Sequence, residues 1–107
     1  MRDSGGDGPC ALLLHGWMFA SDSNWWPVYD DLIEAGLRVL ALDHRGHGRG
    51  LRTAEPFTLE ACAHDAAGVI EHLGCAPVTA VGYSMGGPVA ELLARERPEL
   101  VRGLVLC

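Results

Sequence analysis

The chain has 107 residues and a formal net charge of −6, with 49% hydrophobic and 21% charged residues. At this length we expect one domain, whole or partial, with a modest core, and the chain is shorter than the large α/β enzymes usually are. The composition is that of a folded globular protein and excludes intrinsic disorder. All eight basic residues are arginines spread from Arg2 to Arg102. No basic stripe is therefore present to bind nucleic acid or an anionic membrane surface.

The four cysteines lie far apart, form no CxxC pair and each have apolar neighbours: Cys10, Cys62, Cys75 and Cys107. This arrangement predicts reduced thiols that pack as small hydrophobic side chains in a cytoplasmic protein. Residues 1–9 contain acids and glycines where a signal peptide needs an apolar run, and the apolar run at residues 11–14 is too short. We therefore expect neither export nor a membrane span.

Apolar runs of strand length alternate with helix-length segments, a pattern typical of successive βαβ units around a parallel sheet. The apolar runs predict four parallel strands, at about residues 11–15, 37–42, 77–82 and 102–107. Three helices are expected between them, at about residues 25–35, 58–74 and 85–98. The predicted fold class is therefore α/β, with a single domain over residues 1–107.

The first two predicted helices carry recognisable signals. The first places Val28, Leu32 and Ala35 on one stripe that would face the sheet. The second begins at Thr58, whose hydroxyl can cap the first turn. It ends at Gly74, because glycine suits the left-handed conformation that follows many helices.

The last predicted strand ends the sequence, since residues 103–107 form an apolar β run with no helix or turn after it. A parallel strand is ordinarily followed by another crossover. An unpaired apolar strand also exposes backbone groups that can pair with a second chain. We therefore expect a partial domain that can self-associate through its open sheet edges.

A serine motif lies between the third strand and the third helix. The sequence Gly82-Tyr83-Ser84-Met85-Gly86 has the GxSxG spacing, which is a weak signal alone but a stronger one between a strand and a helix. So abrupt a turn forces strained dihedrals on Ser84, and Gly82 and Gly86 remove side chains that would collide there. The hydroxyl would stand at the positive end of a helix, where an attacking oxygen is favoured.

A nucleophilic serine also needs donors for the oxyanion that forms on attack. One expected donor is the backbone N–H of Met85, directly after the serine. The strand that ends in His15-Gly16-Trp17 supplies the second, which we assign to the Trp17 N–H with Met18 as the fallback. His15 and Gly16 are expected to shape this loop, and His15 is not expected to be the base.

Three motifs in this order and spacing resemble the α/β-hydrolase superfamily: His15-Gly16-Trp17, the glycine-rich loop 43–48, and residues 82–87. The resemblance covers about residues 8–107. It implies that the four strands are the third to sixth of an eight-stranded sheet. The first two would lie side by side, with the third on the other side of the first. His15 and Ser84 would then meet at the point where the strand order reverses, which is where such sheets bind ligands.

The resemblance also implies a chemistry. It indicates a serine hydrolase that needs no cofactor and acts on a small ester, lactone, thioester or similar acyl substrate, and it leaves cofactor-free perhydrolase or acyltransferase activity open. The serine disfavours the aspartate-dependent dehalogenase and epoxide hydrolase reactions of the superfamily. In the family the triad acid and histidine follow later strands, and neither loop is found here. We therefore expect little turnover from the chain alone. The alternative is a noncatalytic fragment, or a binding or interaction module that retains the fold.

Other residues have a structural interpretation beside a functional one. His44 and His47 could form a metal pair with Asp43, but no further ligand stands at fixed spacing, so no metal site is expected. Trp17 and Phe19 could contact substrate or pack on the first helix. The loop lacks the GxxG spacing of a dinucleotide site and the chain has no lysine for a P-loop, so nucleotide binding is not expected.

Overall fold

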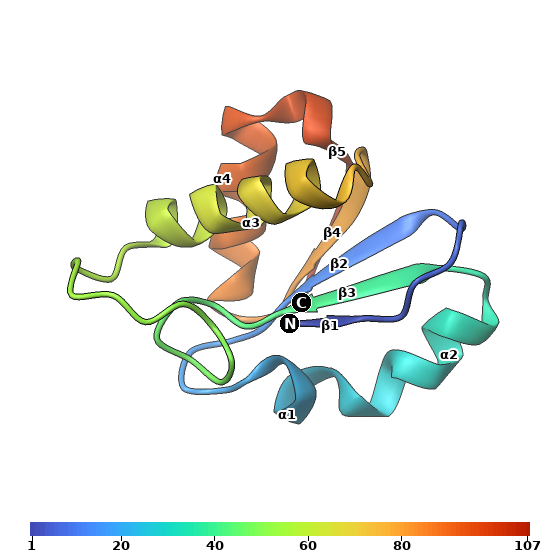
Figure 1. Cartoon of the computed structure of the whole chain (residues 1–107), viewed down its shortest axis with the longest axis horizontal. Coiled ribbons are helices and arrows are strands. Elements are labelled where there is room, and N and C mark those ends of the chain that lie inside the picture. Colours follow the sequence, from blue (N-terminus) through green and yellow to red (C-terminus); the bar gives the residue numbers. More distant parts are fainter.

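The computed structural model describes all 107 residues. A five-stranded sheet crosses the molecule in the order β1-β3-β2-β4-β5 (Figure 1). The strands are β1 (Arg2–Asp3), β2 (Cys10–Leu14), β3 (Arg38–Leu42), β4 (Val78–Gly82) and β5 (Val101–Leu106). The four longer strands are parallel, and only β1 is antiparallel to its neighbour. The four predicted parallel strands and their order are confirmed, and each bound lies within one residue of the expected position.

The central strand β2 is buried at all of its positions. Because side chains alternate across a sheet, Leu12 and Leu14 point to one face and Ala11 and Leu13 to the other. Helices cover both faces, so neither set can be polar. This two-sided burial explains why the strand has a continuous apolar sequence rather than an alternating one.

The short strand β1 was not predicted. It pairs with β3, where Arg2 lies opposite Ala41 and Asp3 lies opposite Leu40. Ion pairs hold it: the Arg38 guanidinium donates to both carboxylate oxygens of Asp3, at 3.0 and 2.7 Å. This strand is held by charged contacts and has no alternation of apolar and polar residues. The hydrophobic pattern of the sequence therefore does not reveal it.

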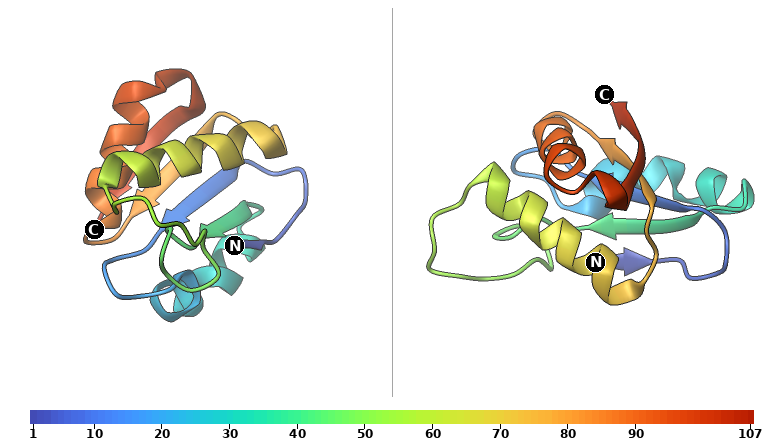
Figure 2. Two further views of the ribbon diagram at one scale, coloured as in Figure 1. Left: turned by 60° about the vertical axis from the view of Figure 1, so that its left-hand side comes forward. Right: turned by 90° about the horizontal axis from the view of Figure 1, so that it is seen from above.

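Helices form a layer on each side of the sheet (Figures 1 and 2). One face is covered by α1 (Ser21–Trp25), a 3₁₀ turn (Trp26–Val28) and α2 (Tyr29–Glu34). The other face is covered by α3 (Leu59–Leu73) and α4 (Gly86–Glu96), and a second 3₁₀ turn (Pro98–Leu100) leads into β5. None of these helices combines the length and the apolar character needed to cross a membrane.

The first helical segment differs from the expected one. It begins at Ser21 instead of residue 25, and a 3₁₀ turn divides it. The side chains packed against the sheet are those of Trp25, Tyr29 and Leu32. Val28 and Ala35 are exposed, so their expected place on the buried stripe was wrong. The stripe is shifted because the two aromatic residues bury more apolar surface than valine and alanine would.

The second and third helices agree with their sequence signals. Thr58 Oγ1 accepts a hydrogen bond from the Ala61 N–H at 3.0 Å at the start of α3. At its end, Gly74 has a φ of 62° and caps the helix in the left-handed conformation. The helix α4 begins at Gly86, one residue later than expected, and ends at Glu96, two residues before the expected end.

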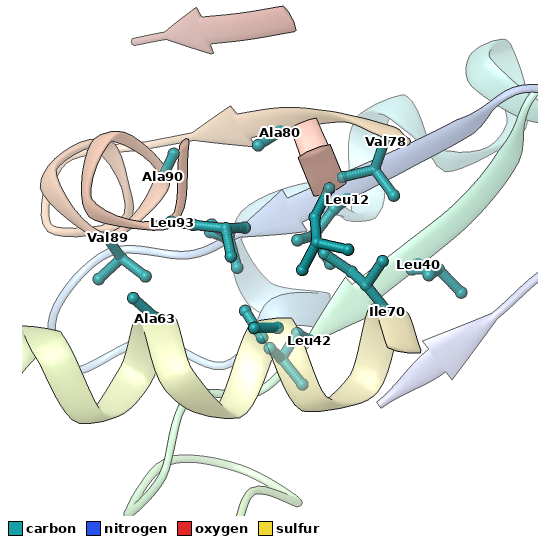
Figure 3. Packing of buried hydrophobic residues seen from close by; sticks show 14 of the residues in the cluster. Leu12, Leu40, Leu42, Ala63, Ile70, Val78, Ala80, Val89, Ala90 and Leu93 are labelled. Atoms are coloured by element: carbon teal, nitrogen blue, oxygen red, sulfur yellow. The ribbon is translucent and has the colours of Figure 1, made fainter. Parts of the chain in front are cut away.

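The larger hydrophobic core lies between the sheet and the pair α3 and α4 (Figure 3). Leu12, Leu40, Ile70 and Leu93 are among its fully buried side chains. A smaller core lies on the other face, beneath α1 and α2. By contrast β5 is thinly covered: the side chains of Leu104, Val105 and Leu106 are 40%, 46% and 50% exposed.

Candidate active site

The turn between β4 and α4 holds Ser84 in a strained conformation, with a φ of 51°. Non-glycine residues rarely adopt this region, and strain of this kind is concentrated at functional sites. A Cβ atom at Gly82 would overlap the carbonyl oxygen of Gly86, and one at Gly86 would overlap that of Leu14. Two positions on either side of the serine therefore require glycine, because the backbone is closely packed there.

Backbone hydrogen bonds tie this turn to the strands on both sides. The Tyr83 N–H donates to the Leu14 carbonyl at 3.0 Å, and the Ser84 N–H donates to the Cys107 carbonyl at 3.2 Å. Within the turn, the Gly87 N–H donates to the Ser84 carbonyl at 2.9 Å. The serine residue itself is exposed. A rigid backbone thus presents an accessible hydroxyl at the carboxyl end of β4.

The loop after β2 lies directly against this turn. A Cβ atom at Gly16 would stand 3.2 Å from the Ser84 Cβ and 3.2 Å from Tyr83 Cδ1, so Gly16 permits the close approach. The Trp17 and Met85 N–H groups, together with that of Met18, donate to no atom of the chain. The structure therefore brings the two predicted oxyanion donors, and the fallback donor, to the same edge of the sheet.

Asn24 holds the loop after β2 in place, a role that no sequence motif indicates. Its Oδ1 atom accepts a hydrogen bond from the Gly16 N–H at 2.8 Å. The loop turns back at Met18, two residues after Gly16. Met18 has a φ of 67°, and the Phe19 N–H donates to the Gly16 carbonyl at 3.4 Å. The bond from Asn24 occupies the Gly16 amide and leaves the next amide, that of Trp17, free for a ligand.

His15 and His44 form a buried reciprocal pair, with ring centroids 4.3 Å apart. The His44 backbone N–H donates to His15 Nε2 at 3.0 Å, and His44 Nε2 lies 3.1 Å from the His15 carbonyl. Since Nε2 of His15 is an acceptor, the neutral ring carries its proton on Nδ1 and donates it to the Gly16 carbonyl at 2.7 Å. By the same logic, His44 is protonated on Nε2.

Burial keeps both rings neutral. It lowers the pKa of His15, and it lowers the pKa of His44 to about 4, with the nearby His15 ring contributing. Both nitrogens of His15 are already hydrogen-bonded, so this ring has no free site to accept a proton from Ser84. The geometry agrees with the expectation that His15 shapes the loop, and that role stays a prediction.

The glycine-rich loop after β3 is anchored away from the serine. The buried Asp43 carboxylate accepts hydrogen bonds from the Ser21 N–H at 2.7 Å and from the Arg49 N–H at 3.1 Å. Burial alone would raise the pKa of Asp43, but these hydrogen bonds hold it well below its usual range. Arg45 makes a two-pronged ion pair with Asp65 on α3, with both distances 2.8 Å. This loop is therefore fixed to both helical layers.

An aromatic cluster lies at the outer side of the site. The rings of Trp17, His47 and Phe57 contact one another, with centroids 5.3 to 5.6 Å apart. Trp17 and Phe19 also line a cavity of about 400 Å³ beside the loop after β2. Phe57 was not singled out from the sequence, because it lies in an irregular segment far from every motif.

None of the five histidines serves Ser84 as a base. His15 and His44 bond to each other, and His47 Nδ1 lies 3.0 Å from the Arg45 carbonyl. The other two, His64 and His72, are exposed on α3. The candidate site therefore combines the exposed Ser84, the unoccupied N–H groups of Trp17 and Met85, and the cavity that Trp17 and Phe19 line.

A family model described as the alpha/beta hydrolase fold matches residues 12–107. The non-heme haloperoxidase of Rhodococcus erythropolis is 39% identical over 102 residues, which cover 94% of this chain and 37% of that protein. The bifunctional esterase/perhydrolase of Acinetobacter calcoaceticus is 37% identical over 101 residues, or 94% of this chain and 36% of the relative. A solved thermophilic esterase from Thermogutta terrifontis superposes with a TM-score of 0.90 at 36% identity, covering 99% of this chain and 38% of its own. The chain thus spans little more than a third of the length of these three proteins.

Proposed function

The chain belongs to the α/β-hydrolase fold family, and we propose that it carries the nucleophile and the oxyanion hole of a serine hydrolase that cleaves ester or related acyl bonds. The observation that carries this proposal is the exposed Ser84, with its φ of 51°, beside the unoccupied N–H groups of Trp17 and Met85. Relatives that are named as esterases support the choice of substrate class.

In the proposed reaction the Ser84 hydroxyl oxygen attacks the acyl carbon, and its proton passes to a base. The carbonyl oxygen becomes an oxyanion, which accepts hydrogen bonds from the Trp17 and Met85 N–H groups. The amino-terminal end of α4 adds a favourable field for this negative charge. The apolar cavity lined by Trp17 and Phe19 would receive the apolar part of a small substrate.

The proposed function is tested with a chimera, in which this chain replaces the matching third of the Thermogutta esterase. We expect the chimera to hydrolyse p-nitrophenyl acetate and to react with a fluorophosphonate probe at Ser84. In its Ser84→Ala form, kcat should fall by about 10⁴-fold or more, because serine and base act as a unit. A chimera that folds, judged by circular dichroism, yet neither turns over ester nor reacts with the probe would refute the proposal.

The chain on its own is expected to be nearly inactive. No histidine reaches Ser84, and a serine without its base loses about 10⁶-fold in kcat in a well-studied protease. Ester hydrolysis by the 107-residue chain should therefore match that of its Ser84→Ala variant. Stoichiometric labelling of Ser84 by a fluorophosphonate within minutes would contradict this expectation.

We also propose that the isolated chain self-associates through β5. This strand pairs only with β4, and its other edge is free. Its exposed apolar side chains include Val105, which lies on the sheet face opposite to α4. Light scattering after gel filtration should give a mass above that of the monomer, and Val105→Lys should shift it towards the monomer. A monomeric wild-type chain at high concentration would disprove this.

A further inference from the structure

Two thiols lie together at the end of the sheet that is remote from Ser84. Cys10 is the first residue of β2, and Cys75 precedes β4. The two strands are parallel, with Cys10 opposite Val78, so both cysteines lie at their amino-terminal ends. Ser84 follows the carboxyl end of β4. The thiol pair is therefore separate from the candidate active site.

Both cysteines line one cavity of about 460 Å³, together with Arg38 and Arg102. Cys10 is 5% exposed, whereas Cys75 is half-buried and its thiol lies 3.8 Å from the Ile70 carbonyl. Burial raises the pKa of Cys10 to about 12, and the adjacent Cys75 thiol contributes through charge and hydrogen bonding. The two thiols thus open onto the same cavity and interact with each other, and Cys75, the more exposed one, is reached first by a small reagent.

The other two thiols have no such partner. Cys62 is completely buried in α3, within the larger core. Cys107 is exposed and its N–H donates to the Gly82 carbonyl, which places it at the Ser84 end of the sheet. Only Cys10 and Cys75 combine proximity to each other with an opening to solvent.

We propose that Cys10 and Cys75 are a redox-sensitive pair, which a hydroperoxide converts to a reversible disulfide. In the first step the Cys75 sulfur attacks one peroxide oxygen, the O–O bond breaks, and the leaving oxygen departs as water or an alcohol. This leaves a sulfenic acid on Cys75. The Cys10 sulfur then attacks the Cys75 sulfur, the S–O bond breaks, and the hydroxyl leaves as water with the Cys10 proton. Two thiols thereby give two electrons and two protons to one peroxide.

The order of events follows from the surroundings of each sulfur. Cys75 is the more accessible of the two thiols and therefore meets the peroxide first. Burial and the Cys75 thiol raise the pKa of Cys10, so its sulfur reacts second, and the nearby Arg38 favours the Cys10 thiolate. The disulfide would join the start of β2 to the segment before β4. Because the bond closes a long loop, the oxidised chain should unfold at a higher temperature, by roughly 5–15 °C.

The test uses the full chain with Cys107→Ser, which removes the exposed thiol that could join two molecules. After brief treatment with hydrogen peroxide, we expect the intact mass to fall by about 2 Da and dithiothreitol to restore it. Peptide mapping without reduction should recover the Cys10 peptide linked to the Cys75 peptide. In a Cys10→Ser version, dimedone should trap the sulfenic acid on Cys75.

Two results would overturn the proposal. One is a mass gain from sulfinic acid on Cys75 with no linked peptide in the chain that retains both cysteines. The other is a linked peptide that contains Cys62 in place of Cys10 or Cys75. Both are read from the chain with Cys10 and Cys75 intact, so they do not depend on whether the Cys10→Ser variant folds.

Discussion

Replacing Gly86 by alanine is expected to lower the free energy of unfolding by about 3 kcal/mol or more. The added Cβ would overlap the carbonyl oxygen of Leu14 and lie 3.0 Å from that of His15. Both obstacles are backbone atoms of the central strand and its loop, which cannot rotate away as a side chain can. The variant must therefore separate α4 from β2, and in doing so it displaces the Ser84–Met85 turn relative to the loop after β2. Urea unfolding followed by circular dichroism measures the loss.

Gly68 provides the matched control, because it undergoes the same change in a different setting. It is exposed within α3, and a Cβ atom there would contact nothing. Gly68→Ala should therefore raise the free energy of unfolding by about 0.5–1 kcal/mol, since alanine is the better residue in a helix interior. Equal and small effects of the two substitutions would show that α4 and β2 are not packed as closely at Gly86 as the structure has them.

The parts of the fold that the sequence predicts are those with a strong periodic or apolar signal. The run Ala11 to Leu14 has to be a buried strand, since four apolar residues in a row between turn signals fit a strand covered on both faces. The segment Arg2–Asp3 carries no such signal, because pairing with β3 and the ion pair to Arg38 define it. Its place in the sheet depends on a residue more than thirty positions away, which a local pattern does not report.

The candidate site divides in the same way. The strand-to-helix turn around Ser84 could be predicted because such a turn needs small residues at fixed offsets, and this spacing is visible in the sequence. The roles of Ser84, Met85 and Trp17 stay predictions. The contact of Asn24 could not be predicted, because its bond to the Gly16 N–H depends on how α1 packs against the loop after β2. The bonds between His15 and His44 likewise join two loops that the strand order brings together. Contacts of this kind follow from the assembled sheet.

The reciprocal histidine pair predicts how stability depends on pH. The pKa of His44 is about 4 in the folded chain and about 6.5 when unfolded, and burial lowers the pKa of His15 as well. Between these values the unfolded chain binds more protons than the folded one, so stability is complete above about pH 6.5 and is lost as the pH falls towards 4. His44 alone accounts for up to about 3 kcal/mol across this window.

The measurement is urea unfolding near pH 7 and at about pH 4.5. Both values lie above the ordinary aspartate pKa of 3.8, so Asp22 and Asp43 are largely ionised in the unfolded as well as the folded chain and contribute little to the difference. His44→Gln should lower the free energy of unfolding near pH 7, because it disturbs the histidine pair. It should also reduce the difference in free energy of unfolding between the two pH values. His72→Gln removes an exposed imidazole from α3 and should keep the wild-type loss. If His44→Gln instead loses as much stability as the wild type, the pair does not control acid sensitivity. A smaller loss in His44→Gln would show that the histidine pair controls acid sensitivity. Protonation of His15 Nε2 then removes the acceptor of the His44 N–H, so acid should release the loop after β2 before the rest of the domain unfolds.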